Sequence, residues 1–362
     1  MINVVEWTRL EPWRVARART DRGETVIVKW MGPHSGRGTH TEAWRLRTEV
    51  AALRFLSEDL ELSLAPRVLA EDLPAGRVVL EDLAPRTALD GLLRRDGADA
   101  HMVRLAAFAR ARGELGASTA GGAELYYRRR SSLGAIDPDA DRLRYAARLR
   151  KEGLREAAML GVPVSGAAER ELDVALAELA DPGPFLVLSN GDPEANNVLV
   201  HAGGPPDARL IDFEFAGFTH ALHDAVCLNV PGPAWMSVGT PARGRGSAAG
   251  PEPAEVYRRA LAAGVPQAED ERRYGVALAA ACVAFALARL RRLPVLDARP
   301  SGDDSRTQLV AILEAAAHTA QTHRALPQLA GLCRHLAEAI RRRWPDADVD
   351  ITALAPYTPR RR

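Results

Sequence analysis

The chain has 362 residues, of which 47% are hydrophobic and 26% are charged, and this composition excludes a disordered or collagen-like protein. The length exceeds what one small domain needs, so we expect one large domain or two coupled ones. The 48 basic and 47 acidic residues leave a net charge of +1, which argues against a nucleic-acid carrier and against a polybasic membrane-binding protein.

The three cysteines, Cys227, Cys282 and Cys333, are far apart and lie in apolar segments. This pattern predicts neither a disulfide framework nor a zinc site and is typical of a reducing compartment, so we expect a cytoplasmic protein. The N-terminus lacks the basic and apolar regions of a signal peptide, and the longest uncharged run, residues 274–288, is too short to cross a bilayer. We therefore expect no membrane partner.

The first 84 residues have the pattern of a small antiparallel sheet with one helix. Short β-favouring runs predict strands, and the helical spacing of Trp44, Leu46, Val50 and Leu53 predicts an amphipathic helix. The predicted strands are 4–10, 14–20, 25–30, 67–70 and 77–80, and the predicted helix is 41–57. A glycine-rich segment, 31–40, is interpreted as a flexible connector.

From residue 85 onward the pattern becomes mainly helical, with a few short strands near the middle of the chain. Helices are predicted at 87–95, 98–119, 139–160, 168–180, 253–264, 269–292, 305–320 and 324–343, and strands at 185–188, 197–201 and 209–213. Residues 231–252, rich in Gly, Pro, Ala and Ser, predict a mobile loop. The basic stretch 126–132, YYRRRSS, is interpreted as a solvated turn. The whole chain thus has an α+β pattern with two lobes.

Three polar residues lie at the ends of predicted strands between positions 186 and 217. An apolar strand leads into Asp192, Asn197 begins the next strand, and Asp212 ends a third one. Where such strands pair as a hairpin, two carboxylates and an amide oxygen can hold a divalent cation and leave one carboxylate to accept a proton, as phosphoryl transfer requires. Asp and Asn also favour turns, so the spacing taken alone favours turn chemistry.

Lys29 closes an apolar strand, TVIVKW, in a chain whose only other lysine is Lys151. Its ammonium group can extend to solvent at the strand end, or it can hold nucleotide phosphates as a compact charge, and the rarity of lysine in this chain favours the second interpretation. Glu49 lies in the following helix, where a solvated face is the usual place for glutamate. A pair between Lys29 and Glu49 would hold the lysine extended toward a ligand.

Together these residues occur in the order and settings of a kinase core, and two stretches carry a more specific resemblance. SNGDPEANNVL resembles the His-Gly-Asp-x-x-x-x-Asn loop of the aminoglycoside phosphotransferase family, which also contains choline and homoserine kinases. LIDFEFAGFTHALHDAV is similar to the Ile-Asp-[Trp/Phe]-Glu-x-Ala-Gly…Asp segment of that family. The resemblance covers residues from about 5 to 230.

The resemblance implies a bilobal, protein-kinase-like fold of the α+β class. A small β-rich N-lobe, residues 1–84, would hold the nucleotide with its sheet and one helix. A larger, mainly helical C-lobe, residues 85–362, would carry the catalytic segment 186–217 and the helices that bind the acceptor. MgATP would lie between the two lobes.

The resemblance also assigns roles to single residues of the catalytic segment. Asp192 is expected to be the base or the orienting group for the acceptor hydroxyl. Asn197 and Asp212 are expected to hold Mg²⁺ on the nucleotide phosphates. Asp224 matches an aspartate that braces the catalytic loop, which is a structural role.

In the N-lobe the resemblance assigns nucleotide contacts. Lys29 would contact the α- and β-phosphates, and Glu49 would position it. The backbone of Glu81, Asp82 and Leu83 would form the interlobe hinge that receives the adenine.

The sequence departs from the family pattern at two places. Asn190 stands where the family usually has His, and its amide can still form hydrogen bonds within the loop. The segment TRLEPWRVA between the first two strands contains no glycine-rich motif, so the nucleotide lid lacks glycines, or Arg14 and neighbouring amides replace it.

The predicted function is an ATP- and Mg²⁺-dependent phosphotransferase, with GTP as an alternative donor, that acts on a hydroxyl of a small molecule such as an antibiotic or another natural product. The acidic stretches 252–255, 269–271 and 303–304 are interleaved with arginines, so the sequence predicts no strongly acidic platform for cationic aminoglycosides. The expected partners are the nucleotide and the acceptor, in a monomer or dimer.

Three other functions stay open at this point. Relatives of this fold phosphorylate Ser or Thr of precursor peptides, so a peptide kinase is the main alternative. A metabolic kinase of the choline or sugar type would use simple metabolites. A pseudokinase would explain Asn190 and the missing glycine motif, but it would not explain why Lys29, Asp192, Asn197 and Asp212 are all present.

Overall fold

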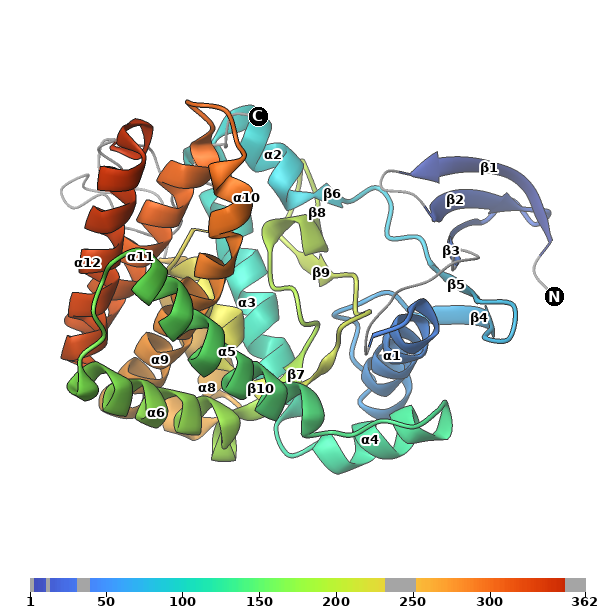
Figure 1. The fold of residues 1–362 in the computed structure, drawn as a ribbon. Helices are drawn as coiled ribbons and strands as arrows, with labels where there is room; N and C mark the ends of the chain where they lie inside the picture. Colours follow the sequence, from blue (N-terminus) through green and yellow to red (C-terminus); the bar gives the residue numbers. More distant parts are fainter. Residues whose placement is uncertain (1–2, 11–13, 31–39, 232–251, 349–362) are drawn as a thin grey trace.

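The computed structural model describes residues 3–10, 14–30, 40–231 and 252–348, which form two lobes (Figure 1). The smaller lobe contains a five-stranded sheet and one long helix, and the larger lobe contains most of the helices and two short sheets. This architecture confirms the predicted α+β class. The predicted loop 231–252 lies outside the described residues except for its two ends, as does most of the connector 31–40.

The sheet of the N-lobe is antiparallel throughout, with the order β1-β2-β3-β5-β4. Its strands are β1 (Val4–Leu10), β2 (Val15–Thr20), β3 (Thr25–Trp30), β4 (Val68–Asp72) and β5 (Arg77–Glu81). On β2 the small side chains Ala16 and Ala18 are buried, whereas Arg17 and Arg19 are exposed. This alternation is typical of a sheet with one solvated face.

Helix α1 (Glu42–Arg54) packs beside β4 and β5. The helix begins after Thr41, whose hydroxyl accepts a hydrogen bond from the backbone N–H of Trp44 at 3.1 Å. Its buried face includes the apolar side chains Leu46 and Val50, together with the carboxylate of Glu49. A buried charge on a helix needs a partner, and this partner comes from the sheet.

The C-lobe is built around helices that pack on one another. They are α2 (Leu89–Asp96), α3 (Met102–Thr119), α4 (Ala123–Ser132), α5 (Ala140–Met159), α6 (Gly166–Ala180), α7 (Leu222–Ala225), α8 (Pro253–Ala262), α9 (Glu271–Arg289), α10 (Leu293–Asp297), α11 (Asp304–Thr322) and α12 (Pro327–Arg343). Helix α9 is rich in alanine and is buried on nearly all sides, against α6 and α11 among others. No helix in the described part of the chain is long and apolar enough to span a membrane.

Two short sheets carry the catalytic segment through the C-lobe. One has the order β6-β8-β9, and the other pairs β10 with β7. The strands are β6 (Thr87–Ala88), β7 (Leu186–Ser189), β8 (Val198–Val200), β9 (Ala208–Leu210) and β10 (Gly217–His220). The predicted strand 209–213 was too long, because the chain leaves β9 before Asp212, and β10 was not predicted.

The interpretation of residues 126–132 as a solvated turn was wrong, because they form most of helix α4. Tyr126 and Arg130 lie one turn apart and are both buried. The guanidinium of Arg130 donates to Thr48 Oγ1 at 3.0 Å and lies 5.6 Å from the ring centre of Trp44. Helix α4 of the C-lobe therefore anchors α1 of the N-lobe, which a local pattern of three arginines did not indicate.

Candidate active site

The catalytic loop leaves β7 through a tight turn at Gly191, where φ is +81°. A Cβ atom at this position would lie 2.4 Å from the carbonyl oxygen of Phe215, so the turn accepts only glycine. The turn leads into Asp192, which lines the cavity described below. Asn197 then fixes Asp192 by donating from Nδ2 to the Asp192 backbone oxygen at 2.9 Å and to its Oδ2 at 3.0 Å.

Asp212 follows β9 in a left-handed backbone conformation, with φ of +62°. The preceding residue, Ile211, donates its N–H to Asn197 O at 3.0 Å and accepts a hydrogen bond from Asn190 Nδ2 at 3.0 Å. The structure therefore brings the loops of Asp192, Asn197 and Asp212 together, as the sequence predicts. Their catalytic roles stay predictions.

Lys29 of β3 joins the N-lobe to this cluster. Its Nζ lies 2.5 Å from Glu49 Oε1 and 3.0 Å from Asp212 Oδ1. Burial lowers the pKa of Lys29, but the two carboxylates outweigh this effect and hold the pKa above its ordinary value. The ammonium therefore stays charged, in a place suited to binding phosphate.

Oxygen atoms of Asn197 and Asp212 fit a hard divalent cation. The amide nitrogen of Asn197 donates to Asp192, and its Oδ1 accepts one hydrogen bond from Asn196 Nδ2 at 2.9 Å, which leaves that oxygen a second lone pair. Asp212 contacts Lys29 through Oδ1, so Oδ2 is its oxygen left for a cation. Among the described residues there is no group of three or more Asp, Glu, His or Cys side chains able to hold a metal. Mg²⁺ commonly uses one or two protein oxygens and completes its shell with phosphate and water, which matches this donor set.

A buried network of hydrogen bonds and one ion pair holds the start of the catalytic loop. Asp224 accepts a hydrogen bond from Ser189 Oγ at 2.5 Å and lies 3.6 Å from Arg112 Nη1. Arg112 also donates to Asn190 Oδ1 at 2.6 Å. Asp224 therefore has the contacts of a brace, and Arg112 is a residue that the sequence did not single out.

The side chains of the predicted hinge residues Glu81 and Asp82 pair with arginines of the N-lobe. Glu81 Oε2 accepts a hydrogen bond from the N–H of Arg67 at 3.2 Å, and Asp82 pairs with Arg17 at 2.8 Å. Leu83 is buried. The adenine contact of this hinge stays a prediction that concerns the backbone.

Arg14 does not extend over the cleft in this structure, because its guanidinium pairs with Glu42 at the start of α1. Its backbone has φ of +80° at the entry to β2. The suggestion that Arg14 replaces a glycine-rich lid therefore finds no direct contact to support it among the described residues, which omit the neighbouring positions 11–13.

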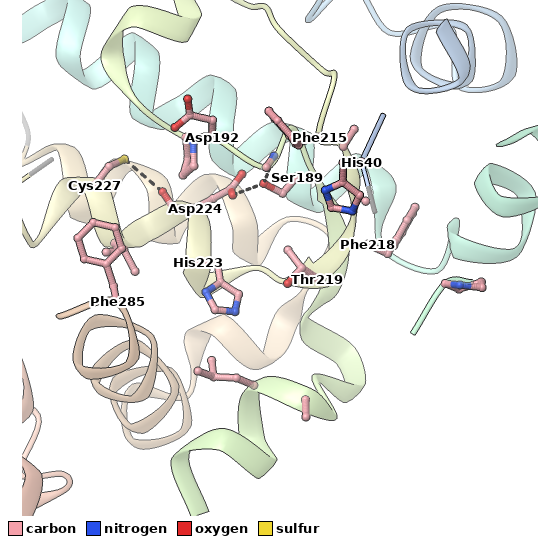
Figure 2. A pocket seen from close by; sticks show the side chains of 18 of the residues that line it. His40, Ser189, Asp192, Phe215, Phe218, Thr219, His223, Asp224, Cys227 and Phe285 are labelled. Carbon is pink, nitrogen blue, oxygen red and sulfur yellow. Dashed lines mark hydrogen bonds between the residues drawn. The ribbon is translucent and has the colours of Figure 1, made fainter. Parts of the chain in front are cut away.

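A cavity of about 800 Å³ opens beside Asp192 (Figure 2). Its walls come from α1, α4, α6, α9, β10 and the catalytic loop, and they are largely apolar and aromatic. The lining includes Trp44, Tyr127, Leu176, Leu179, Phe215, Phe218 and Phe285. A cavity of this size is in the range of small-molecule binding sites.

A second acidic side chain in the lining of the cavity is Glu194, two residues after Asp192 in the chain. Burial, together with the charge of Asp192, raises the pKa of Glu194 to about 7, although Arg289 and Arg112 act in the opposite direction. Burial also raises the pKa of Asp192, and the hydrogen bond from Asn197 partly counters this. Two carboxyl groups with raised pKa values thus face one cavity, as is common at functional sites.

Comparisons with known proteins bear on the family and on the fold. Residues 17–269 match the model of a family described as the phosphotransferase enzyme family. The structure resembles an ethanolamine kinase from Plasmodium vivax with a TM-score of 0.50 and 11% sequence identity, covering 86% of this chain and 81% of that one. This likeness shows the same bilobal fold, as predicted from the sequence.

Two further solved structures are similar over most of the chain. An aminoglycoside phosphotransferase from Alicyclobacillus acidocaldarius has a TM-score of 0.49 and 16% identity, covering 92% of this chain and 93% of that one. A choline/ethanolamine kinase family protein from Mesorhizobium loti has a TM-score of 0.45 and 16% identity, with 91% and 93% covered. The comparison with curated proteins gave no match.

Proposed function

This chain belongs to the phosphotransferase enzyme family, and from that premise we propose that it transfers the γ-phosphoryl group of MgATP to a hydroxyl group of a small molecule. The observation that carries the proposal is the contact of Lys29 with Asp212 at 3.0 Å, beside the hydrogen-bonded pair of Asp192 and Asn197. These contacts bring together a cation suited to phosphate, oxygen donors suited to Mg²⁺ and a carboxylate suited to the acceptor.

In the proposed reaction the acceptor hydroxyl oxygen attacks the γ-phosphorus, and the bond from that phosphorus to the β–γ bridging oxygen breaks. The hydroxyl proton passes to the carboxylate of Asp192, and ADP leaves with the bridging oxygen. Asn197 already holds Oδ2 of Asp192, so Oδ1 is the atom available to the hydroxyl. Catalysis is then mainly positioning and neutralisation of charge, to which a bound Mg²⁺ contributes.

The apolar and aromatic walls of the cavity support a natural product with a hydrophobic body as the acceptor. A ligand that fills about 800 Å³ is larger than choline or a simple sugar. Glu194 and Arg289 also line the cavity, where their polar groups can orient such a ligand. Antibiotics are one class of natural product that fits this description.

The donor site is tested by thermal melting of the full chain with and without MgATP and MgGTP. A nucleotide at about one hundred times its dissociation constant should stabilise the fold by roughly 2.7 kcal/mol, which gives a clear rise in Tm. Asp212→Asn should weaken or abolish the rise, whereas Asp181→Asn, an exposed position on the C-lobe, should retain it. If neither nucleotide changes the Tm of the wild-type protein, a pseudokinase becomes the better description.

The acceptor is tested by following ADP release with a panel of macrolides, aminoglycosides, other hydroxylated natural products, choline, ethanolamine and serine-containing peptides. We expect stimulation by a hydrophobic natural product, and Asp192→Asn should abolish it while nucleotide binding remains. Stimulation by choline alone or by a peptide alone would replace the natural-product acceptor with a metabolic or a peptide kinase function.

A further inference from the structure

We propose that Arg112, on the buried face of α3, is a positioning residue for the catalytic loop and acts as a pair with Asn190. This inference rests on the proposed function, because the loop that it positions carries Asp192. Arg112 lies on α3, whereas the proposed phosphate-binding and metal-binding residues lie on or beside strands.

Arg112 is buried, with 1% of its surface exposed. Its Nη1 donates to Asn190 Oδ1 at 2.6 Å, and its Nη2 reaches the backbone oxygen of Asp192 at 3.5 Å. The same guanidinium lies 3.6 Å from Asp224. The planar fork of arginine therefore contacts the loop at two points, on either side of Gly191.

Asn190 connects Arg112 to the backbone of Asp192 and to the backbone of Ile211. Its Oδ1 also accepts a hydrogen bond from the N–H of Asp192 at 3.2 Å, and its Nδ2 donates to Ile211 O at 3.0 Å. Ile211 directly precedes Asp212. A continuous chain of hydrogen bonds thus runs from α3 through the catalytic loop to the residue beside the proposed metal ligand.

The chemistry of the amide explains why Asn suits position 190 when Arg is at position 112. The amide oxygen has two lone pairs and accepts two hydrogen bonds here, whereas an imidazole nitrogen has one lone pair and accepts one. The histidine of the motif that this chain resembles could not receive both Arg112 and the N–H of Asp192 on one atom. Asn190 is therefore matched to Arg112, and it does not by itself indicate a degenerate site.

A purely structural role is the competing explanation, because Arg112 also neutralises the buried carboxylate of Asp224. Arg112→Lys separates the two roles, since it keeps the positive charge near Asp224 but replaces the two separate nitrogens of the planar fork by one, so the geometry of the two loop contacts is lost. Arg110→Lys on the exposed face of the same helix is the matched control.

The readout is phosphoryl transfer to water, measured as ADP release from MgATP by the full chain, together with the KM for ATP and the Tm. For Arg112→Lys we expect kcat to fall roughly tenfold to a hundredfold while the KM for ATP changes less than about twofold, because the loop shifts but the nucleotide site does not. Arg110→Lys should match the wild-type protein in all three measurements.

Asn190→Ala removes the same hydrogen bond from its other end and leaves the pair of Arg112 and Asp224 in place. It should lower kcat to a similar extent, and the double variant should lose little more than the worse single variant, because both changes break one chain. If Arg112→Lys does not fold, the kcat of Asn190→Ala tests the positioning role.

Wild-type kcat in a folded Arg112→Lys protein or in Asn190→Ala overturns the positioning role, and so does a double variant whose losses multiply. These outcomes leave the proposed function intact, because the wild-type protein is then active. A wild-type protein that neither binds nor turns over MgATP overturns the proposed function and this inference with it.

Discussion

His223 lies in the wall of the cavity beside Asp192, where burial keeps its imidazole neutral (Figure 2). Burial, with the neighbouring His220, lowers the pKa of His223 to about 3 from an ordinary value of 6.5. In the unfolded chain the ring binds a proton as the pH falls below its ordinary pKa, whereas in the folded protein it does so only near pH 3. The free energy of unfolding therefore decreases as the pH falls through this window.

We expect His223 alone to lower the free energy of unfolding by about 2 kcal/mol between pH 7.5 and pH 5. His223→Gln should remove this part of the pH dependence, and urea unfolding at both pH values measures it. His335→Gln is the matched control, because His335 is exposed and lies away from the cavity. Equal pH dependence in the wild-type protein and His223→Gln would contradict the assignment of a neutral ring in the cavity wall.

Helices α3 and α8 approach each other closely at Gly113. A Cβ atom on Gly113 would lie 2.5 Å from the backbone oxygen of Tyr257 and 2.6 Å from the Cβ of Ala260. Both neighbours belong to α8, so the helix as a whole would have to move. This contact matters for function because Gly113 directly follows Arg112 on α3.

Gly113→Ala should therefore destabilise the protein by about 1–3 kcal/mol, as overpacking of a helix interface does. The matched control is Gly91→Ala on α2, where a Cβ would meet nothing within 4 Å, and it should stabilise the protein by up to about 1 kcal/mol through helix propensity. Both values are measured by urea unfolding. A neutral Gly113→Ala would show that α8 can shift at little cost.

The two lobes are joined by more than the hinge, because α4 of the C-lobe packs on the end of α1. Phe55 lies 5.6 Å from Tyr126 between ring centres, and Arg129 donates to Asp59 at 2.6 Å. The same apolar core runs from α1 into the C-lobe. The outer strand β1 does not share this core, since none of its residues is buried.

We therefore expect amide hydrogen exchange to be fastest in β1 and slowest in the buried helices α9 and α11. MgATP should slow exchange in β2 and β3, since Lys29 of β3 is proposed to bind its phosphates, and Asp212→Asn should reduce this effect. Mass spectrometry of the exchanged protein gives the rate for each element. Exchange in β1 as slow as in α9 would contradict this order of stability.

Residues close together in the chain were largely predictable. Asp192 and Asn197 share one loop, and Asp212 follows the next hairpin, so their spacing and the resemblance to a family motif were enough to find them. The strands of the N-lobe were predicted for a similar reason, because a run of β-favouring residues is a local property of the sequence. The matching family model confirms the resemblance itself.

The fold class and the candidate catalytic residues can be predicted from the amino-acid sequence, because short-range patterns and one family motif indicate both. The environment of each group depends on the folded chain. Arg112 meets Asn190 across 78 positions, Arg130 is buried by a helix from the other lobe, and the cavity takes its walls from several separate elements. Burial and hydrogen bonding depend on partners distant in the chain, and local composition carries no record of those partners.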